Sequence, residues 1–357
     1  MIARAVERFA TWESFLAGLT VLMLAYAVIS VPNFASSFNL SQAAAGVSER
    51  ALIVLPMTLL IIAREIDLSV ASILALCSVV FGVLVQAGLP LAVAGVAVLA
   101  TGALAGAFNG ALVTVFGLPS LVVTLGTLAM FRGIGYIVLG SGSVNEFPVS
   151  FTDFGIDTLG NSPIPLTALP FLILAPIFTV VLQSSAVGRR IYALGGSPDV
   201  AKYAGVRTDG IRFCLFVVTG LVCAIASIVF TARLANARAD NAVGLELDVI
   251  TIVLLGGVNV FGGRGKLTGV FWALILIATL RNVLGLRQVG GDAQGTVIGL
   301  LLILSLLLST TTQRLYAALA TLRGRPRSGG PRSGLVAGPT ATSPEASDIN
   351  NRGRDRP

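Results

Sequence analysis

The chain has 357 residues, of which 55% are hydrophobic and 11% are charged, whereas an ordinary soluble domain carries about 25% charged residues. So few charges cannot cover the surface of a water-soluble globule of this length, which argues against a soluble enzyme and a secreted disulfide scaffold. The formal net charge of +7 does not indicate a nucleic-acid binder, because seven arginines and only three acids lie in residues 323–357. The composition instead predicts a membrane protein that crosses the bilayer several times.

Ten apolar segments, separated by turn or charge signals, predict an all-α polytopic membrane protein with about ten transmembrane helices. A helix needs about 20 residues to cross the bilayer, so segment 50–63 is short, and segment 247–263 is rich in glycine. The first segment is too long for the core of a signal peptide, and we expect it to be retained as a helix. In chain order the segments are 15–31, 50–63, 68–86, 90–115, 119–139, 167–184, 212–232, 247–263, 267–284 and 294–311.

Basic residues predict the orientation of these segments. With the N-terminus inside, eighteen Lys and Arg residues fall on the inner side and five on the outer side. Cytoplasmic loops carry the excess of basic residues, so both termini are expected to be cytoplasmic. Residues 1–322 then form the membrane domain. Residues 323–357, rich in Gly, Pro, Ser and Arg, are expected to be a disordered basic cytoplasmic tail.

Two acidic pairs in the order Glu-apolar-Asp precede apolar segments. They are Glu65 with Asp67, and Glu246 with Asp248. Five predicted spans separate the pairs, so the helices that they begin run in opposite directions. This arrangement indicates an inverted repeat of spans 2–5 and 7–10. The helix dipole alone also favours carboxylates near helix N-termini, so a purely structural role stays open.

Small residues at every fourth position favour close helix packing within the segment 90–115. Gly102, Gly106 and Gly110 would lie on one helix face, where the absence of side chains lets two backbones approach. Asn109 lies in the same run and could either hydrogen-bond across helices or face a polar channel. Packing is the simpler interpretation of the glycines.

The longest inner loop, residues 186–212, contains a short predicted helix. Ser197 suits the N-cap, Pro198 the first helical position and Asp199 the positive end of the helix dipole, while Gly205 suits a left-handed C-cap. About seven helical residues are too few to be stable alone in water, so the helix needs a partner or a bilayer surface to lie on. A plain turn between two spans is the alternative. The glycines and paired arginines that precede the helix make it less attractive; they are Gly188, Arg189, Arg190, Gly195 and Gly196.

An ATP site is not predicted on this chain. The nearest candidate is the glycine-rich run 262–268, but a phosphate-binding loop needs Gly, four residues, then Gly-Lys-Ser/Thr. Val260 stands where the first glycine belongs, and Leu267 stands where the hydroxyl that binds Mg²⁺ should be. The sequence contains no histidine, the commonest metal ligand, and no nucleophile and base can be paired. We therefore expect neither a metal site nor enzyme activity.

Several strings together resemble the membrane-spanning permeases of bacterial ABC importers, in the ribose/xylose/arabinose family of sugar permeases. Two positions depart from the usual pattern, with Glu65 and Ala71 in place of glycine. The matching strings are Glu65-Ile66-Asp67-Leu68-Ser69, Asn109-Gly110, Leu118-Pro119, Thr124-Leu125-Gly126-Thr127, Arg132-Gly133, the loop 188–206, Glu246-Leu247-Asp248, Gly256-Gly257 and Gly262-Gly263-Arg264-Gly265.

The resemblance implies an inner-membrane subunit that imports a monosaccharide or a sugar-like solute by alternating access. Two permease subunits, identical or different, would pair around the path. A cytoplasmic ATPase would bind ATP and Mg²⁺, and a periplasmic sugar-binding protein would deliver the solute. The motifs are compatible with a pentose, a hexose, a deoxysugar such as rhamnose, or a furanosyl signalling molecule such as autoinducer 2. By the same resemblance, the residues that contact the ATPase are Gly188, Arg189, Arg190, Gly195, Ser197, Pro198, Asp199 and Gly205.

Polar residues in otherwise apolar segments are candidates for the solute path. They are Asn109, Thr124, Thr127 and Asn259. Arginines within spans, Arg132 and Arg281, are costly in lipid and therefore usually functional. A self-contained, ion-coupled secondary transporter is the alternative function, although no mid-span relay of Asp, Glu or His supports proton coupling. An intramembrane enzyme is less favoured, because no catalytic set is visible.

Overall fold

The computed structural model describes residues 12–160, 162–291, 293–301 and 303. The predicted tail 323–357 and half of the tenth apolar segment, residues 302 and 304–311, lie outside these residues. The described residues confirm an all-α fold, since their only strand-like pairs are two isolated bridges. In chain order the helices are α2 (Trp12–Ser30), α3 (Ser37–Ala45), α4 (Ser48–Ile62), α5 (Val70–Gln86), α6 (Leu91–Thr114), α7 (Ser120–Leu139), α8 (Val149–Ile156), η1 (Leu166–Ala168), α9 (Leu169–Ser184), α10 (Ala186–Gly196), α11 (Pro198–Tyr203), α12 (Thr208–Leu234), α13 (Leu245–Leu255) and α14 (Leu267–Leu286).

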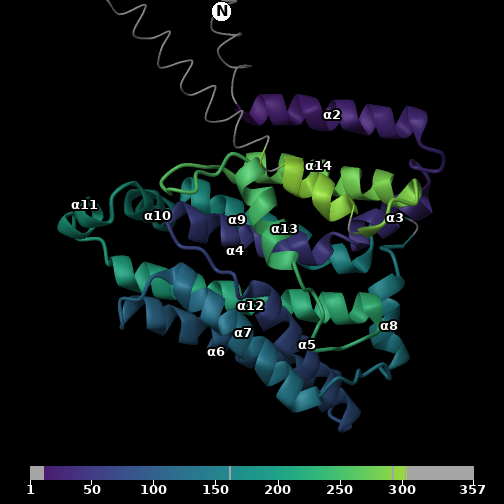
Figure 1. The fold of residues 1–357 in the computed structure, drawn as a ribbon, viewed down its shortest axis with the longest axis horizontal. Coiled ribbons are helices and arrows are strands. Elements are labelled where there is room, and N and C mark those ends of the chain that lie inside the picture. Colours follow the sequence, from purple (N-terminus) through teal and green to yellow (C-terminus); the bar gives the residue numbers. More distant parts are fainter. Residues whose placement is uncertain (1–11, 161, 292, 302, 304–357) are drawn as a thin grey trace, which may run out of the picture. The chain divides into compact units, whose positions relative to one another are not determined.

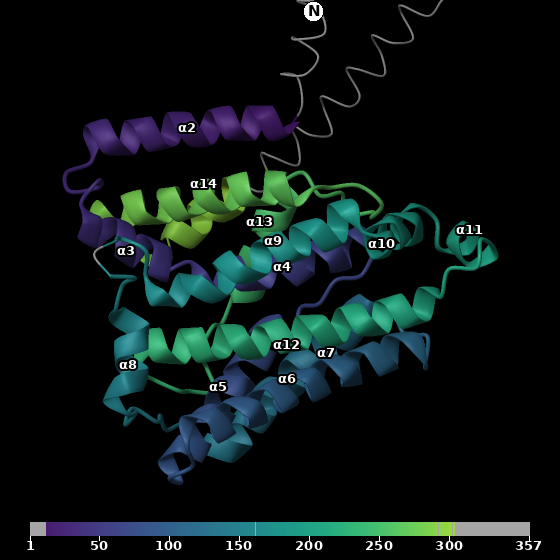
Figure 2. The same cartoon turned by 180° about the vertical axis from the view of Figure 1, so that it is seen from behind.

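The long helices lie in layers (Figures 1 and 2). α12 lies in the middle, with α5, α6 and α7 on one side and α4, α9, α13 and α14 on the other, and α2 packs on the far side of α14. α10 and α11 lie at one end of the bundle, and α3 and α8 lie at the other. We name these the inner end and the outer end, following the orientation predicted from the basic residues.

α4 forms the centre of the packed core. Every residue of α4 except Arg50 is buried, because α4 contacts α9, α12, α13 and α14 on its different sides. A helix that is apolar all round is typical of such a fully enclosed position. Its 15 residues rise only about 22 Å, less than the hydrocarbon thickness. The preceding helix α3, from which α4 is bent by 44°, is the segment that could lengthen it to a full span.

The number of predicted spans is only partly tested. Among the described residues, six helices are long and apolar enough to cross a membrane, or seven if α3 and α4 form one span. α5 is a shorter apolar helix of 17 residues, and α13 has 11 residues. About ten transmembrane helices therefore remains a prediction.

The predicted helical segment 247–263 was wrong beyond residue 255. α13 ends at Leu255 and is followed by Gly256 and by Gly257, which has a φ of +85°. Glycine adopts this left-handed conformation without steric cost and so stops the helix. Asn259 consequently lies in a loop and not in an apolar helix. The structure also adds α3, α8 and α10, which the sequence analysis did not predict as helices.

The glycine stripe of α6 forms a close helix contact, as predicted, and the structure shows that its partner is α12. A Cβ atom at Gly102 would collide with the carbonyl of Gly220, and a Cβ atom at Gly106 would collide with the carbonyl of Phe216. Gly110 lies close to the backbone and the ring of Phe213, with less restricted space. The absence of side chains thus brings the two backbones into direct contact, which is the purpose of small residues between membrane helices.

The two acidic pairs lie near opposite ends of α4. Glu65 and Asp67 follow its C-terminus, while Asp248 binds Arg50 in its first turn at 3.1 Å. Glu246 and Asp248 lie in the first turn of α13, as predicted. Acidic pairs at opposite ends of one central helix are consistent with α5 and α13 starting from opposite faces of the membrane. The inverted repeat itself stays a prediction.

Replacing Gly106 with Val should destabilise the bundle. The added side chain has no space against the α12 backbone, so we expect a loss of about 3 kcal/mol, at the upper end of overpacking costs. Gly95→Val is the matched control, because nothing lies within 4 Å of a Cβ at Gly95 on the same helix. Denaturant unfolding of the purified protein in detergent measures the difference, and equal stability of the two variants would contradict the assigned contact.

Candidate functional site

The connection that follows α4 holds α10 in place through Arg64. Arg64 has a φ of +68°, a conformation that costs free energy in a residue with a side chain and is often found at functional positions. Its Nε donates to the carbonyl of Gly195 at 2.7 Å, and its Nη2 donates to the carbonyl of Gly196 at 2.8 Å. A cation therefore binds the free carbonyls at the C-terminus of α10, where the helix dipole favours positive charge.

The carbonyl of Ile62 is the closest contact point between these elements. It accepts a hydrogen bond of 2.8 Å from the backbone N–H of Gly263, and a Cβ atom at Gly195 would collide with it. Tyr192 of α10 donates its hydroxyl to the carbonyl of Gly265 at 2.6 Å. We name the residues 62–69, 195–196 and 262–265 the inner junction, because three separate parts of the chain meet there.

The inner junction is tied to the long helices by polar contacts. Arg212 of α12 forms a salt bridge of 2.9 Å with Glu65. The backbone of Ile66 is held from α7, since its N–H lies 3.3 Å from Ser120 Oγ and its carbonyl accepts from the Thr124 hydroxyl at 3.2 Å. A displacement of this connection would therefore be transmitted to both α7 and α12.

A fully buried polar chain attaches the inner junction to α6. Asn109 Nδ2 donates to Ser69 Oγ at 2.8 Å, and Ser69 Oγ donates to Asp67 Oδ1 at 2.6 Å. Asp67 lies in the connection between α4 and α5, outside both helices. Burial, which disfavours the charged form, raises the pKa of Asp67 to about 6, and hydrogen bonds from Ser69 and Asn109 oppose this rise.

The short helix α11 begins and ends as the sequence analysis predicted. Ser197 is its N-cap and accepts from the Val200 N–H at 3.4 Å, Pro198 is its first residue and Asp199 lies in its first turn. Gly205 has a φ of +80°. The preceding helix α10 was missed, although Ser185 caps it by accepting from the Val187 and Gly188 N–H groups. Its signal was the apolar pair Ile191 and Leu194, both buried.

The predicted contact residues of α10 divide between its two faces. Gly188 and Gly195 are buried against the bundle, and a Cβ atom at either would collide with a neighbouring backbone. Arg189 and Arg190 are exposed. Their side chains form no salt bridge within the part of the chain that the structure describes.

The four predicted path residues bond within the subunit. Asn109, Thr124 and Thr127 are buried, and the Thr127 hydroxyl lies 3.4 Å from the carbonyl of Thr124. Asn259 Oδ1 accepts from the N–H of Phe261 at 2.8 Å in the loop after α13. The structure thus brings Asn109 and Thr124 to the inner junction, while a role of all four in lining the path stays a prediction.

A second cluster of charges, which sequence analysis did not assemble, lies at the outer end. Glu49 is fully buried and binds Arg50 at 3.0 Å and Arg233 at 2.9 Å. Asp248 binds Arg50 at 3.1 Å and Arg281 at 2.7 Å. We name these five residues the outer cluster; they join α4, α12, α13 and α14. Removing one partner from such a network leaves a buried charge uncompensated, which is strongly destabilising.

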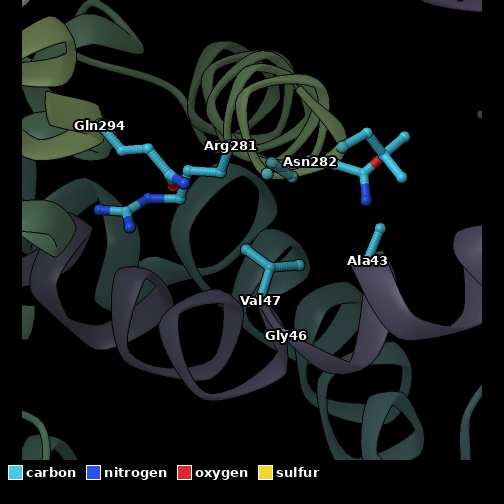
Figure 3. Close-up of a pocket in the computed structure, with 9 residues that line it drawn as sticks. Ala43, Gly46, Val47, Arg281, Asn282 and Gln294 are labelled. Atoms are coloured by element: carbon cyan, nitrogen blue, oxygen red, sulfur yellow. The ribbon is translucent and has the colours of Figure 1, made fainter. Parts of the chain in front are cut away.

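A cavity of about 370 Å³ lies beside the outer cluster, at the break between α3 and α4. Figure 3 shows the polar side chains of Arg281, Asn282 and Gln294 across from Gly46 and Val47. These side chains supply hydrogen-bond donors and acceptors of the kind that bind hydroxyl groups. In the described part of the chain, no group of three or more His, Cys, Asp or Glu residues is placed to hold a metal ion.

Comparisons with known proteins agree with the motifs. Residues 39–306 match a family described as the permease component of the branched-chain amino acid transport system. The autoinducer 2 import system permease protein LsrD of Photorhabdus luminescens is 35% identical over 71% of this chain and 78% of its own length. LsrD of Klebsiella pneumoniae is 36% identical over 67% and 73%, and LsrD of Escherichia coli K12 is 34% identical over 71% and 78%. No solved structure matches the chain.

Replacing Gly195 with Ala should loosen α10. The added methyl group would collide with the Ile62 carbonyl and the Gly263 N–H, so we expect α10 amides to exchange hydrogen about tenfold faster, a loss of about 1.4 kcal/mol in local stability. Gly196→Ala is the neighbouring control, because nothing lies within 4 Å of a Cβ there. Hydrogen exchange followed by mass spectrometry measures both variants, and similar exchange in the two would show that the close approach does not hold α10.

Proposed function

This chain belongs to the family of transport-system permease components, as its motifs predicted, and we propose that it is the subunit through which a sugar-like solute crosses the inner membrane. A separate cytoplasmic ATPase binds ATP and Mg²⁺ and drives the movement, so this chain needs no cofactor of its own. Both termini lie in the cytoplasm, a second permease subunit completes the path, and a periplasmic binding protein delivers the solute. The LsrD relatives import autoinducer 2, which makes this furanosyl molecule, or a monosaccharide of similar size, the proposed cargo.

The observation that carries the proposal is the two-sided character of α10 and α11. Their inner-junction side is anchored by Arg64, Gly195 and Tyr192. The opposite side exposes apolar residues, with Val200 at 66% and Tyr203 at 93% exposure, alongside the two free arginines Arg189 and Arg190. An aromatic residue and arginines beside apolar residues are typical of a protein-docking surface.

The inner junction gives this surface a mechanical connection to the spans. A partner that pushes α10 acts on residues 62–69, because Arg64 and the Ile62 contact leave little room for independent movement. The same connection is bonded to α6, α7 and α12 through Ser69, Ile66 and Glu65. Movement at the ATPase therefore reaches three long helices through one short segment, which is what alternating access requires.

The outer end supplies the opposite gate in this proposal. The outer cluster holds α4 to α12, α13 and α14 through salt bridges of 2.7–3.1 Å. Charge pairs of this kind have alternative partners, and two discrete pairings of one interface are the basis of many conformational switches. The cavity beside Arg281, Asn282 and Gln294 would then receive the solute when the outer end opens.

Reversing the charges of Arg189 and Arg190 should weaken ATPase binding. In the double variant Arg189→Glu/Arg190→Glu, two carboxylates would face the partner groups that bind the two arginines. We therefore expect the affinity for the ATPase to fall at least about tenfold. Co-purification of the ATPase with the permease measures this, while the amount of permease in the membrane should not change. Arg287→Glu, an exposed arginine at the outer end, is the control. Undiminished ATPase binding in the double variant would contradict the docking role.

The purified chain alone should not accumulate solute in proteoliposomes. Uptake is expected only when the ATPase and ATP are on the cytoplasmic side, because no ion-coupling relay and no phosphate-binding loop is present in the sequence. Radiolabelled solute uptake with an imposed proton or sodium gradient tests the alternative function. Gradient-driven uptake without the ATPase would show that the chain is a secondary transporter.

A further inference from the structure

An apolar groove lies at the inner end of the bundle, outside the inner junction. Its volume is about 590 Å³, and it is formed between α9, α10 and α12 with one contribution from α4. All its lining residues are uncharged except Arg207. We propose that this groove binds one acyl chain of an anionic phospholipid, whose headgroup lies at Arg207. The binding site goes beyond the proposed transport function and does not depend on the ATPase.

The length of the groove fits half of a bilayer. α12 contributes a single stripe to it, since the lining positions repeat every three or four residues. These residues are Arg207, Gly210, Ile211, Cys214, Leu215 and Val218. The stripe from Arg207 to Val218 extends about 16 Å at 1.5 Å per residue, and one leaflet supplies about half of the 30 Å hydrocarbon core. An acyl chain that entered beside Arg207 would therefore end near the bilayer midplane.

Charge selects the headgroup. Arg207 precedes α12, is exposed, and its side chain has no salt bridge or hydrogen bond within the described residues. The nearest acid in the sequence, Asp209, lies 3.7 Å from Arg212 instead. A free guanidinium at the boundary between water and hydrocarbon attracts an anionic headgroup and can bind phosphate oxygens in a bidentate manner.

A comparison within the molecule supports this assignment. A second apolar groove of about 300 Å³ lies at the outer end between α3, α4, α9 and α14, and no charged residue lines it. That groove can be filled by any acyl chain, whereas the inner groove adds a specific interaction for an anionic lipid. Val187 and Ile191 of α10 form one wall of the inner groove, so a lipid bound there would also support the face of α10 opposite the ATPase.

Cys214 provides a direct test, because it lines the groove and is exposed, whereas Cys77 and Cys223 are buried. Phosphatidylglycerol added to the detergent-purified full chain should slow alkylation of Cys214 by N-ethylmaleimide. Phosphatidylcholine with the same acyl chains should protect far less, and glycerol phosphate, which lacks acyl chains, should not protect. Native mass spectrometry should find one retained phosphatidylglycerol for each chain.

Two substitutions sharpen the test. Arg207→Gln should raise the phosphatidylglycerol concentration needed for protection about fivefold, as expected for one basic residue at a membrane surface, while Arg189→Gln should not. Gly210→Leu should fill the groove and abolish the retained lipid, while Gly133→Leu on α7, where nothing lies within 4 Å of a Cβ, should not. Equal protection by the two phospholipids would show a non-specific lipid shell. No protection by either would show that the groove does not hold a phospholipid chain, and either result would overturn the proposal.

Discussion

The backbone carbonyl of Ile62 is the contact on which the arrangement of this protein depends. It accepts a hydrogen bond from Gly263 and lies against Gly195, so the end of the central helix, the end of α10 and a glycine-rich loop meet at one atom. Only glycine allows two other backbones to come so close. Arg64 then bonds the last carbonyls of α10 from the same segment. The C-terminus of α10 is thereby held to the core by these contacts.

The buried carboxylates of the described residues, Glu49, Glu65 and Asp67, lie near the two ends of α4, and most of the apolar core lies between them. The inner junction contains Asp67, Ser69 and Asn109, and the outer cluster contains two carboxylates shared among three arginines. Buried charges and amides are costly unless they are paired. Their pairing at the ends, and the close packing of α6 on α12, make the bundle a set of rigid elements. Such elements can switch between two discrete arrangements but cannot deform gradually.

Much of the architecture was predictable because local rules acted alone. Most of the apolar segments, the glycine stripe of α6 and the caps of α11 each depend on residues within a few positions, and the structure agrees with them, except that α13 ends at Leu255. The site was less predictable. From the sequence, Arg64 is only one of the basic residues that predict the orientation. Its hydrogen bonds to α10 depend on Gly195 and Gly196, which lie far along the chain. The same holds for Glu49, which is bound by Arg233. α10 was missed because glycines and arginines surround Ile191 and Leu194, the apolar pair by which the helix packs on the bundle.

An α-helical membrane permease could be predicted without a structure, because the scarcity of charge, the length of the apolar segments and the family motifs are all local features of the chain. The sequence also predicted the start and the end of α11, where Ser197 caps the first turn and Gly205 follows the last. Tertiary structure alone decided which polar residues meet. Asn109 and Thr124 bond inward at the junction, and five charges from four helices form the outer cluster. These outcomes follow from packing between distant elements, which satisfies buried polar groups only once the helices are assembled.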